Sequence, residues 1–92
     1  MQAWLVCFDI SDDRNRYRVV KHLSEYGVRV QKSVFEISVN SPAELQQLRN
    51  NLTHWLDEED DLRFYFLCLN FRRKSTDLDG RRIAVYPSAI IL

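Results

Sequence analysis

Residues 3–13 read AWLVCFDISDD, an apolar run that ends in a carboxylate and is followed by a pair of acids. A short apolar run bounded by turn residues is typical of a buried strand, and Ser or Asp ahead of a periodic segment is typical of a helix start. Asp9 is therefore expected where a strand, about Ala3 to Asp9, ends and a helix begins. Its carboxylate could face a ligand there. The alternative is that Asp9 pairs with Arg16 or accepts backbone N–H groups at the helix start.

The segment from about Asp12 to Tyr26 has the spacing of an amphipathic helix, with Gly27 as the expected stop. One face of this helix is apolar and carries Val19, Val20, Leu23 and Tyr26. The opposite face is basic and carries Arg14, Arg18 and Lys21. Arg16 falls among the apolar residues, where a guanidinium needs an anionic partner, and Asp9 and Asp13 are the candidates within reach.

The next part of the chain predicts two strands and a second helix. Val28 to Val39 alternates as β structure does, which we interpret as two strands broken near Lys32-Ser33, although one long bent strand is possible. Ser41 is the expected N-cap of the helix, with Pro42 at its first position and Glu44 completing a capping box. Apolar residues then recur at helical spacing: Leu45, Leu48, Leu52, Trp55 and Leu56.

The last third begins with an acidic stretch, Asp57–Asp61, which we expect to be a solvated loop. Leu62 to Leu69 is nearly all apolar and predicts a strand buried on both faces or at the centre of a sheet. Asn70 to Gly80 is polar and loop-like. Arg82 to Tyr86 resembles a fifth, short strand ahead of an apolar tail, residues 89–92.

The order of these elements is β-α-β-β-α-β with an added C-terminal strand, which predicts an α+β, ferredoxin-like fold. We expect one domain over residues 1–92, with its core in about 1–70 and the C-terminal strand and tail in about 81–92. Two helices on one sheet face leave the other face open. Such a face, together with an apolar tail, predicts a homodimer.

Composition narrows the class of protein. At 46% hydrophobic residues the chain is not expected to be disordered, and no apolar run approaches the roughly 20 residues of a membrane span. Thirteen basic and thirteen acidic residues cancel, which argues against indiscriminate nucleic-acid binding but permits a local basic face. No secretory signal is recognisable, so we expect a cytoplasmic location. Cys7 and Cys68 are then expected to be buried free thiols.

Two long blocks carry a family resemblance: VCFDISDDRNRYRVVKHLSEYG, residues 6–27, and RVQKSVFE, residues 29–36. Together they resemble the small CRISPR-associated nuclease of the adaptation machinery, the CRISPR-associated protein two family. The resemblance implies a ferredoxin-like homodimer that acts on nucleic acid, binds the larger CRISPR integrase and takes part in spacer acquisition. It also implies a metal-dependent endonuclease that acts on single-stranded RNA or, in some members, on double-stranded DNA.

The resemblance also implies roles for individual residues. Asp9 matches the metal-binding acid, and the metal is expected to be Mg²⁺ or another divalent ion such as Mn²⁺. One carboxylate binds Mg²⁺ poorly, and a two-fold axis near Asp9 would supply a second. The positions tied to activity are Asp9, Arg16, Arg18, Arg29 and Phe35. The expected nucleic-acid contacts are Arg14, Arg16, Arg18, Lys32 and Ser33. Phe8 stands where many members have Tyr, so any role of that hydroxyl is lost.

Two other functions remain open. A non-catalytic dimeric scaffold could bridge two integrase dimers and hold duplex DNA on its basic face. A ferredoxin-like module that binds a small ligand or a metal is the weaker alternative, because the chain has neither a Gly-rich phosphate loop nor a C-x-x-C motif. For single residues, Phe35 could simply be core, and Arg14 and Arg18 could be an ordinary solvated helix face.

Overall fold

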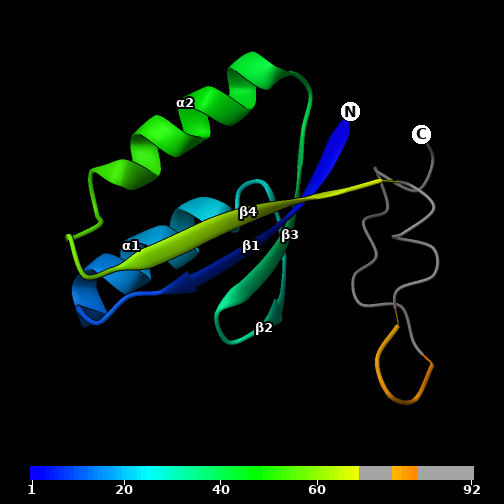
Figure 1. Ribbon diagram of the computed structural model, residues 1–92, viewed down its shortest axis with the longest axis horizontal. Coiled ribbons are helices and arrows are strands. Elements are labelled where there is room, and N and C mark those ends of the chain that lie inside the picture. The colour runs from blue at the N-terminus through cyan, green and yellow to red at the C-terminus, as the bar shows by residue number, and fades with distance from the viewer. Residues whose placement is uncertain (69–75, 81–92) are drawn as a thin grey trace.

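The computed structural model describes residues 1–68 and 76–80. Six elements follow one another: β1 (Gln2–Asp9), α1 (Asp13–Leu23), β2 (Gly27–Gln31), β3 (Val34–Val39), α2 (Pro42–Thr53) and β4 (Asp61–Leu67). This is the α+β, β-α-β-β-α-β order that the sequence predicts, and Figure 1 shows both helices on the same side of the sheet. The expected fifth strand, residues 82–86, and the tail lie outside the described residues.

The four strands form one antiparallel sheet in the order β2-β3-β1-β4. The central strand β1 pairs with β3 at Val6↔Phe35 and with β4 at Val6↔Phe64. Successive side chains of a strand point to opposite faces of the sheet. The face that carries Val6 packs against α1 and α2 and is called the helix face below. The opposite face, which carries Cys7 and Asp9, is called the open face.

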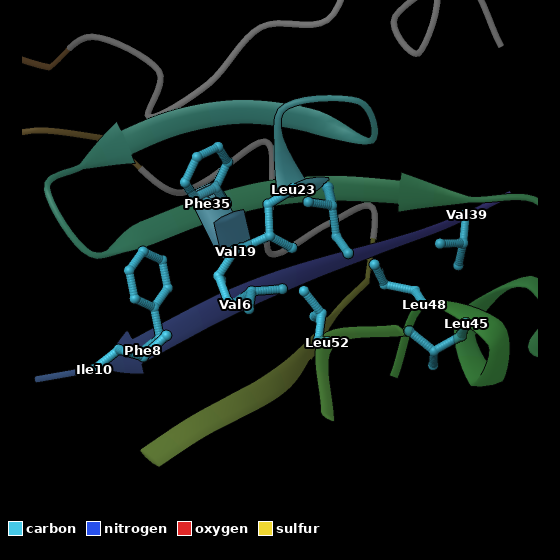
Figure 2. Close-up of a cluster of buried hydrophobic side chains, with 11 residues drawn as sticks. Val6, Phe8, Ile10, Val19, Leu23, Phe35, Val39, Leu45, Leu48 and Leu52 are labelled. Atoms are coloured by element: carbon cyan, nitrogen blue, oxygen red, sulfur yellow. The ribbon is translucent and has the colours of Figure 1, made fainter. Parts of the chain in front are cut away.

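The core lies between the helix face and the two helices (Figure 2). Phe35 and Ile37 from β3 meet Val19 and Leu23 from α1, and these side chains are fully buried. The remaining buried members come from β1, the residue after it, β3 and α2: Val6, Phe8, Ile10, Val39, Leu45, Leu48 and Leu52. Each such side chain stabilises the fold by about 1.5–3 kcal/mol relative to an exposed one, so this layer holds the ends of the strands in place.

The end of α1 differs from the predicted one, whereas the start of α2 agrees with the prediction. Helix α1 ends at Leu23 rather than near Tyr26. The Ser24 hydroxyl donates to Val20 O over 2.8 Å and the Tyr26 N–H donates to Leu23 O over 2.9 Å. These bonds satisfy the last carbonyls, so no left-handed residue is needed, and Gly27 begins β2 instead of stopping the helix. Ser41 caps α2 as predicted, because its Oγ accepts from the Glu44 N–H over 3.2 Å.

The last apolar run forms a strand, as predicted, but the prediction that it is buried on both faces is wrong. Strand β4 is the outermost of the four described strands on its side of the sheet, and it begins at Asp61, which the sequence had assigned to a loop. Its aromatic side chains are partly exposed, 48% for Tyr65 and 58% for Phe66. Phe64 is covered on the helix face by the Arg49 guanidinium, 4.6 Å from the ring centroid. A long polar side chain therefore shields one aromatic residue of this strand, while the other two keep partly exposed rings.

Two further expectations can be compared with the described residues. The break between β2 and β3 falls at Lys32-Ser33, as predicted. Both cysteines are free thiols, but Cys68 is exposed and Cys7 is half-buried, so the expectation that both are buried is wrong.

In the part of the chain that the structure describes, no helix has the length and apolar character needed to cross a membrane.

Candidate functional site

Asp9 is the last residue of β1, and its side chain is exposed on the open face. Its partner across the sheet is Asp61, the first residue of β4. Directly opposite residues of an antiparallel pair point to the same face, with Cβ atoms roughly 4.5–5.5 Å apart. The fold thus places a second carboxylate beside Asp9 within one copy of the chain. Asp61 is not recognisable as a site residue in the sequence, because it falls in the acidic run expected to be a loop.

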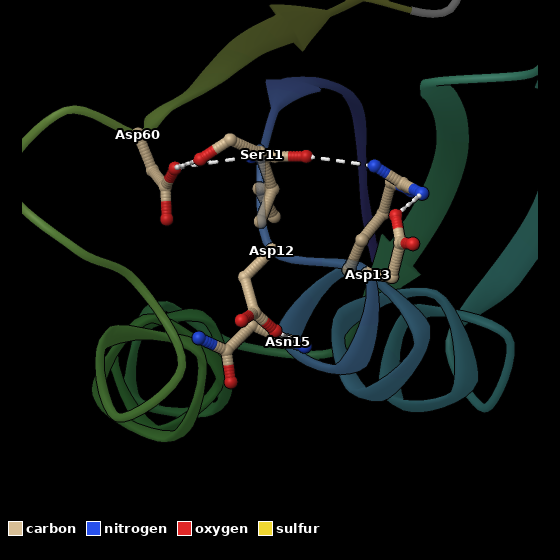
Figure 3. Close-up of polar contacts among 7 residues, drawn as sticks. Ser11, Asp12, Asp13, Asn15 and Asp60 are labelled. Carbon is tan, nitrogen blue, oxygen red and sulfur yellow. Dashed lines mark hydrogen bonds and ion pairs between the residues drawn. The ribbon is translucent and has the colours of Figure 1, made fainter.

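The segment after Asp9 is fixed by polar contacts at both of its ends (Figure 3). Asp60, just ahead of β4, accepts from the Ser11 N–H over 3.3 Å and from the Ser11 hydroxyl over 3.5 Å. Asp12 caps α1, because its carboxylate accepts from the Asn15 N–H over 2.8 Å. The expectation of a freely solvated acidic loop is therefore wrong for Asp60, which is half-buried and ties β4 to the start of α1.

Arg16 stabilises the segment between Asp9 and α1 through two further contacts. Its Nη1 donates to Ile10 O over 3.0 Å, and its Nη2 pairs with the Asp13 carboxylate. Of the two anionic partners that the sequence offered, Asp13 is the one used. The side chain is about a third exposed, so Arg16 lies at the boundary of the core rather than within it. These bonds orient the turn that leads from Asp9 into α1.

Arg14 and Arg18 are exposed and lie one turn apart on the solvent side of α1. With Ser11, Asp12, Asp13 and Asn15 they line a shallow, open hollow at the start of the helix. A helix N-terminus favours negative charge, and two guanidinium groups beside it suit phosphate oxygens. Asp12 and Asp13 line the same hollow, so the two arginines are its exposed cations among equally many carboxylates.

The turn between β2 and β3 lies next to the end of β1, because the Phe8 N–H donates to Ser33 O over 3.0 Å. Arg29 stabilises this turn: its Nε donates to Lys32 O over 2.9 Å, and its Nη2 bonds to the same oxygen. Lys32 is exposed and Ser33 is half-buried. The fold thus brings the expected contacts Lys32 and Ser33 to the sheet end where Asp9 lies.

Phe35 is fully buried on the helix face, so its ring has no access to a bound molecule. The ring packs against Phe8 at a centroid distance of 6.2 Å, and the Arg29 guanidinium lies 5.9 Å from its centroid. Phe35 can therefore affect the site by supporting Arg29 and the end of β1, and the role in activity that the resemblance implied stays a prediction.

A further cation of the open face escaped the sequence analysis. Arg63 lies opposite Cys7 in the β1–β4 register, and its Nε donates to both oxygens of Asp61 over 3.2 and 3.0 Å. Hydrogen bonds to Tyr65 and Asp61 raise the pKa of Arg63 further, so the guanidinium stays charged. The alternation Asp61, Arg63, Tyr65 along one strand face is the signal that could have revealed this row.

The donor set around Asp9 fits one class of ion. Within residues 1–68 and 76–80, no three His, Cys, Asp or Glu side chains gather as a metal cluster. Mg²⁺ is usually held by one or two carboxylates, with waters and substrate phosphates completing the shell. Asp9 and Asp61 supply that number of carboxylates on one exposed face, so they suit a hard cation that arrives with a phosphate ligand.

Comparisons with known proteins agree on one family. The model of the family described as CRISPR associated protein Cas2 matches residues 1–75. A protein of Chloroflexus aurantiacus named CRISPR-associated endoribonuclease Cas2 1 is 44% identical over 73 residues, which cover 77% of this chain and 77% of that protein. A Rhodospirillum rubrum protein named CRISPR-associated endoribonuclease Cas2 4 is 36% identical over 78 residues, covering 85% of this chain but 63% of that protein.

The fold is also similar to that of a chain in a solved partial Cas6-RT-Cas1–Cas2 complex. The TM-score is 0.83 at 36% identity, over 94% of this chain and 100% of that chain. The likeness therefore extends over nearly the whole length of both chains.

Proposed function

The chain belongs to the CRISPR-associated Cas2 family, and on that premise we propose that it is an endonuclease that hydrolyses phosphodiester bonds during spacer acquisition. Single-stranded RNA is the proposed substrate, because the relatives named above are called endoribonucleases. The observation that carries the proposal is the in-register pair Asp9 and Asp61 at the sheet end where α1, with the exposed Arg14 and Arg18, also begins.

Asp9 and Asp61 would hold a divalent ion such as Mg²⁺ or Mn²⁺. When bound, such an ion lowers the pKa of a coordinated water and balances the negative charge of a phosphodiester under attack. Beyond metal binding, the chain's own part is to bind and orient the nucleic acid. Arg14 and Arg18 would hold phosphates flanking the reacting one, since both guanidinium groups are exposed and multiply donating.

Other residues of the expected set support this surface. Lys32 and Ser33 lie in the turn beside the end of β1, and from there they would contact the nucleic-acid strand. Arg16 and Arg29 are engaged with Asp13 and Lys32 O, so they act as positioning residues for the loop and the turn. Phe35 would act one step further away, through the packing that supports Arg29.

We further propose a homodimer that binds the larger CRISPR integrase. The open face carries partly exposed apolar groups, with Val28 39% and Tyr65 48% exposed, and it has no described helix across it. Val28 and Tyr65 lie in one row across this face, in register with Leu5, and two copies joined through that row would leave the Asp9–Asp61 pairs at the sheet end accessible. The integrase is proposed as partner because the similar solved chain is part of a Cas1–Cas2 complex.

One observation favours a second candidate, a dimeric scaffold that binds duplex DNA between integrase dimers without cutting it. The two carboxylates of one copy are few for a nuclease, and the described residues offer no third ligand. Arg14 and Arg18 of α1 would then serve for DNA binding alone.

The experiment that separates these functions is cleavage by the purified full chain of labelled single-stranded RNA and of duplex DNA with the same sequence. Each is incubated with Mg²⁺, with Mn²⁺ and with a chelator. The proposal predicts RNA products that require the metal. Products from duplex DNA alone would show that the substrate is duplex DNA and not single-stranded RNA. Intact substrates under all metals and across a range of pH would contradict the nuclease and favour the scaffold.

A further inference from the structure

We propose that Arg63 is a phosphate-binding residue of the Asp9 site, held in place by Asp61 and Tyr65 on the open face. The inference rests on the proposed function, since it assigns a substrate contact to the same site. Arg63 would donate to a non-bridging oxygen of the phosphate that the Asp9–Asp61 pair receives.

The strand register places Arg63 beside the pair. Cys7 lies opposite Arg63, and Asp9 lies opposite Asp61. These four residues share the open face, because side chains two apart on a strand point the same way. Asp9 and Arg63 are therefore diagonal neighbours, roughly 7–8 Å apart at their backbones, a separation that a long side chain spans.

The contacts of Arg63 orient its guanidinium and leave donors for a ligand. A guanidinium has five N–H donors. Both bonds to Asp61 leave from Nε, and the Tyr65 hydroxyl can accept at most two more. Among the residues that the structure describes, at least two terminal N–H donors therefore remain, on a side chain that is 64% exposed. An oriented, exposed fork of this kind matches the geometry of two phosphate oxygens.

The other arginines near this end are placed differently. Arg16 is bonded to Asp13 and Ile10 O, and Arg29 is bonded to Lys32 O. Arg14 and Arg18 lie on α1, in the layer that covers the helix face. Of the arginines on the described strands, Arg63 is the one that the register puts on the same face as Asp9.

Asp61 can bind Arg63 and a cation at the same time. A carboxylate offers about four lone-pair sites, so it can accept from Arg63 and still face a cation beside Asp9. Metal-binding carboxylates are commonly hydrogen-bonded in this way, and the second bond fixes their orientation. Arg63 would therefore hold Asp61 in position in addition to contacting phosphate.

The test uses Arg63→Gln and Arg63→Lys in the full chain, with Arg49→Gln as a control. Arg49 also lies beside β4, but its guanidinium packs over Phe64 on the helix face. Arg49→Gln removes one positive charge, as Arg63→Gln does, so the two variants have the same net charge. Binding of a single-stranded RNA is measured with chelator over a series of salt concentrations. The slope of log K against log salt should be about 0.7 shallower per lost phosphate contact for Arg63→Gln. It should be unchanged for Arg49→Gln.

Cleavage of the same RNA provides the second measurement. We expect kcat/KM to fall by about 10- to 100-fold for Arg63→Gln, as for loss of a charged hydrogen bond, and less for Arg63→Lys, which keeps the charge without the fork. The melting temperature should not move, because exposed ion pairs contribute little to stability.

The outcomes separate this inference from the proposed function. A wild-type chain that binds RNA without cutting it contradicts the nuclease, and the salt slope still decides on Arg63. An Arg63→Gln chain with wild-type slope and wild-type kcat/KM overturns the inference. It is also overturned if Arg63→Gln alters the oligomeric state in light scattering, since Arg63 would then be an interface residue. Absence of RNA binding by the wild type would overturn both.

Discussion

Replacing Phe35 with Leu should lower stability while leaving cleavage by the folded molecules nearly unchanged. The ring is fully buried and packs on Phe8, with the Arg29 guanidinium 5.9 Å from its centroid. Leu fills most of this space but loses several ring contacts. Arg29 keeps its bonds to Lys32 O, so the turn beside the end of β1 should persist.

The size of the effect follows from burial. Truncation of a buried Phe to Ala costs about 3–5 kcal/mol, and the smaller change to Leu should cost about 1–2 kcal/mol. A domain of this length has a free energy of unfolding of about 5–14 kcal/mol, so the variant should still fold. The melting temperature should fall by roughly 5–15 °C. Thermal unfolding followed by circular dichroism measures this shift, and RNA cleavage well below the transition measures the activity.

Phe66→Leu is the matched control, because Phe66 is an aromatic residue of the same sheet that is 58% exposed. Its melting temperature should change by less than half as much as that of Phe35→Leu. The reasoning is refuted if Phe35→Leu melts like the wild type yet cleaves about 100-fold more slowly, since Phe35 would then contact the substrate.

Three more predictions concern the caps, the loop and pH. Ser41→Ala should cost about 1 kcal/mol in urea unfolding, because the Glu44 N–H loses its acceptor at the start of α2. Asp60→Asn should cost about 0.5–1.5 kcal/mol in the same assay, because its bonds to Ser11 lose their charged acceptor; wild-type stability would contradict this role. Burial raises the pKa of the Cys7 thiol above 9.0, so the native state holds that proton more tightly than the unfolded chain. The free energy of unfolding should therefore fall as pH rises from about 9 through the native pKa, and Cys7→Ala should decline less steeply.

The order of elements was predictable because each has a local signal. The apolar run before Asp9 and the cap at Ser41 depend on neighbours in sequence, and both predictions are confirmed. The end of α1 was misplaced, because Gly27 is a common stop signal but hydroxyl and backbone bonds at Ser24 and Tyr26 had already satisfied the helix carbonyls.

The position of β4 could not be inferred from its composition. A run rich in Phe and Leu suits a central strand, and only the pairing of β1 with both neighbours shows that β4 is the outermost of the described strands on its side. For the same reason Asp61 and Arg63 escaped notice as site residues. Their closeness to Asp9 comes from the β1–β4 register, a pairing of distant segments that no local pattern records.

The partner of Arg16 shows a similar limit. Helical spacing placed its guanidinium toward the core, yet the choice between Asp9 and Asp13 depended on the path of the loop between them. In the structure that loop turns so that Asp13 is bonded to Arg16 and Asp9 stays on the open face.

Participation of Asp9 in RNA cleavage is tested most directly by the single-turnover rate of single-stranded RNA cleavage with Mg²⁺ by Asp9→Asn. Glu58→Gln serves as the control, because it also removes an exposed negative charge, from the loop before β4. We expect a loss of about 100-fold or more for Asp9→Asn with an unchanged melting temperature, and a wild-type rate for Glu58→Gln. Cleavage by Asp9→Asn at the wild-type rate would show that Asp9 has no part in the reaction.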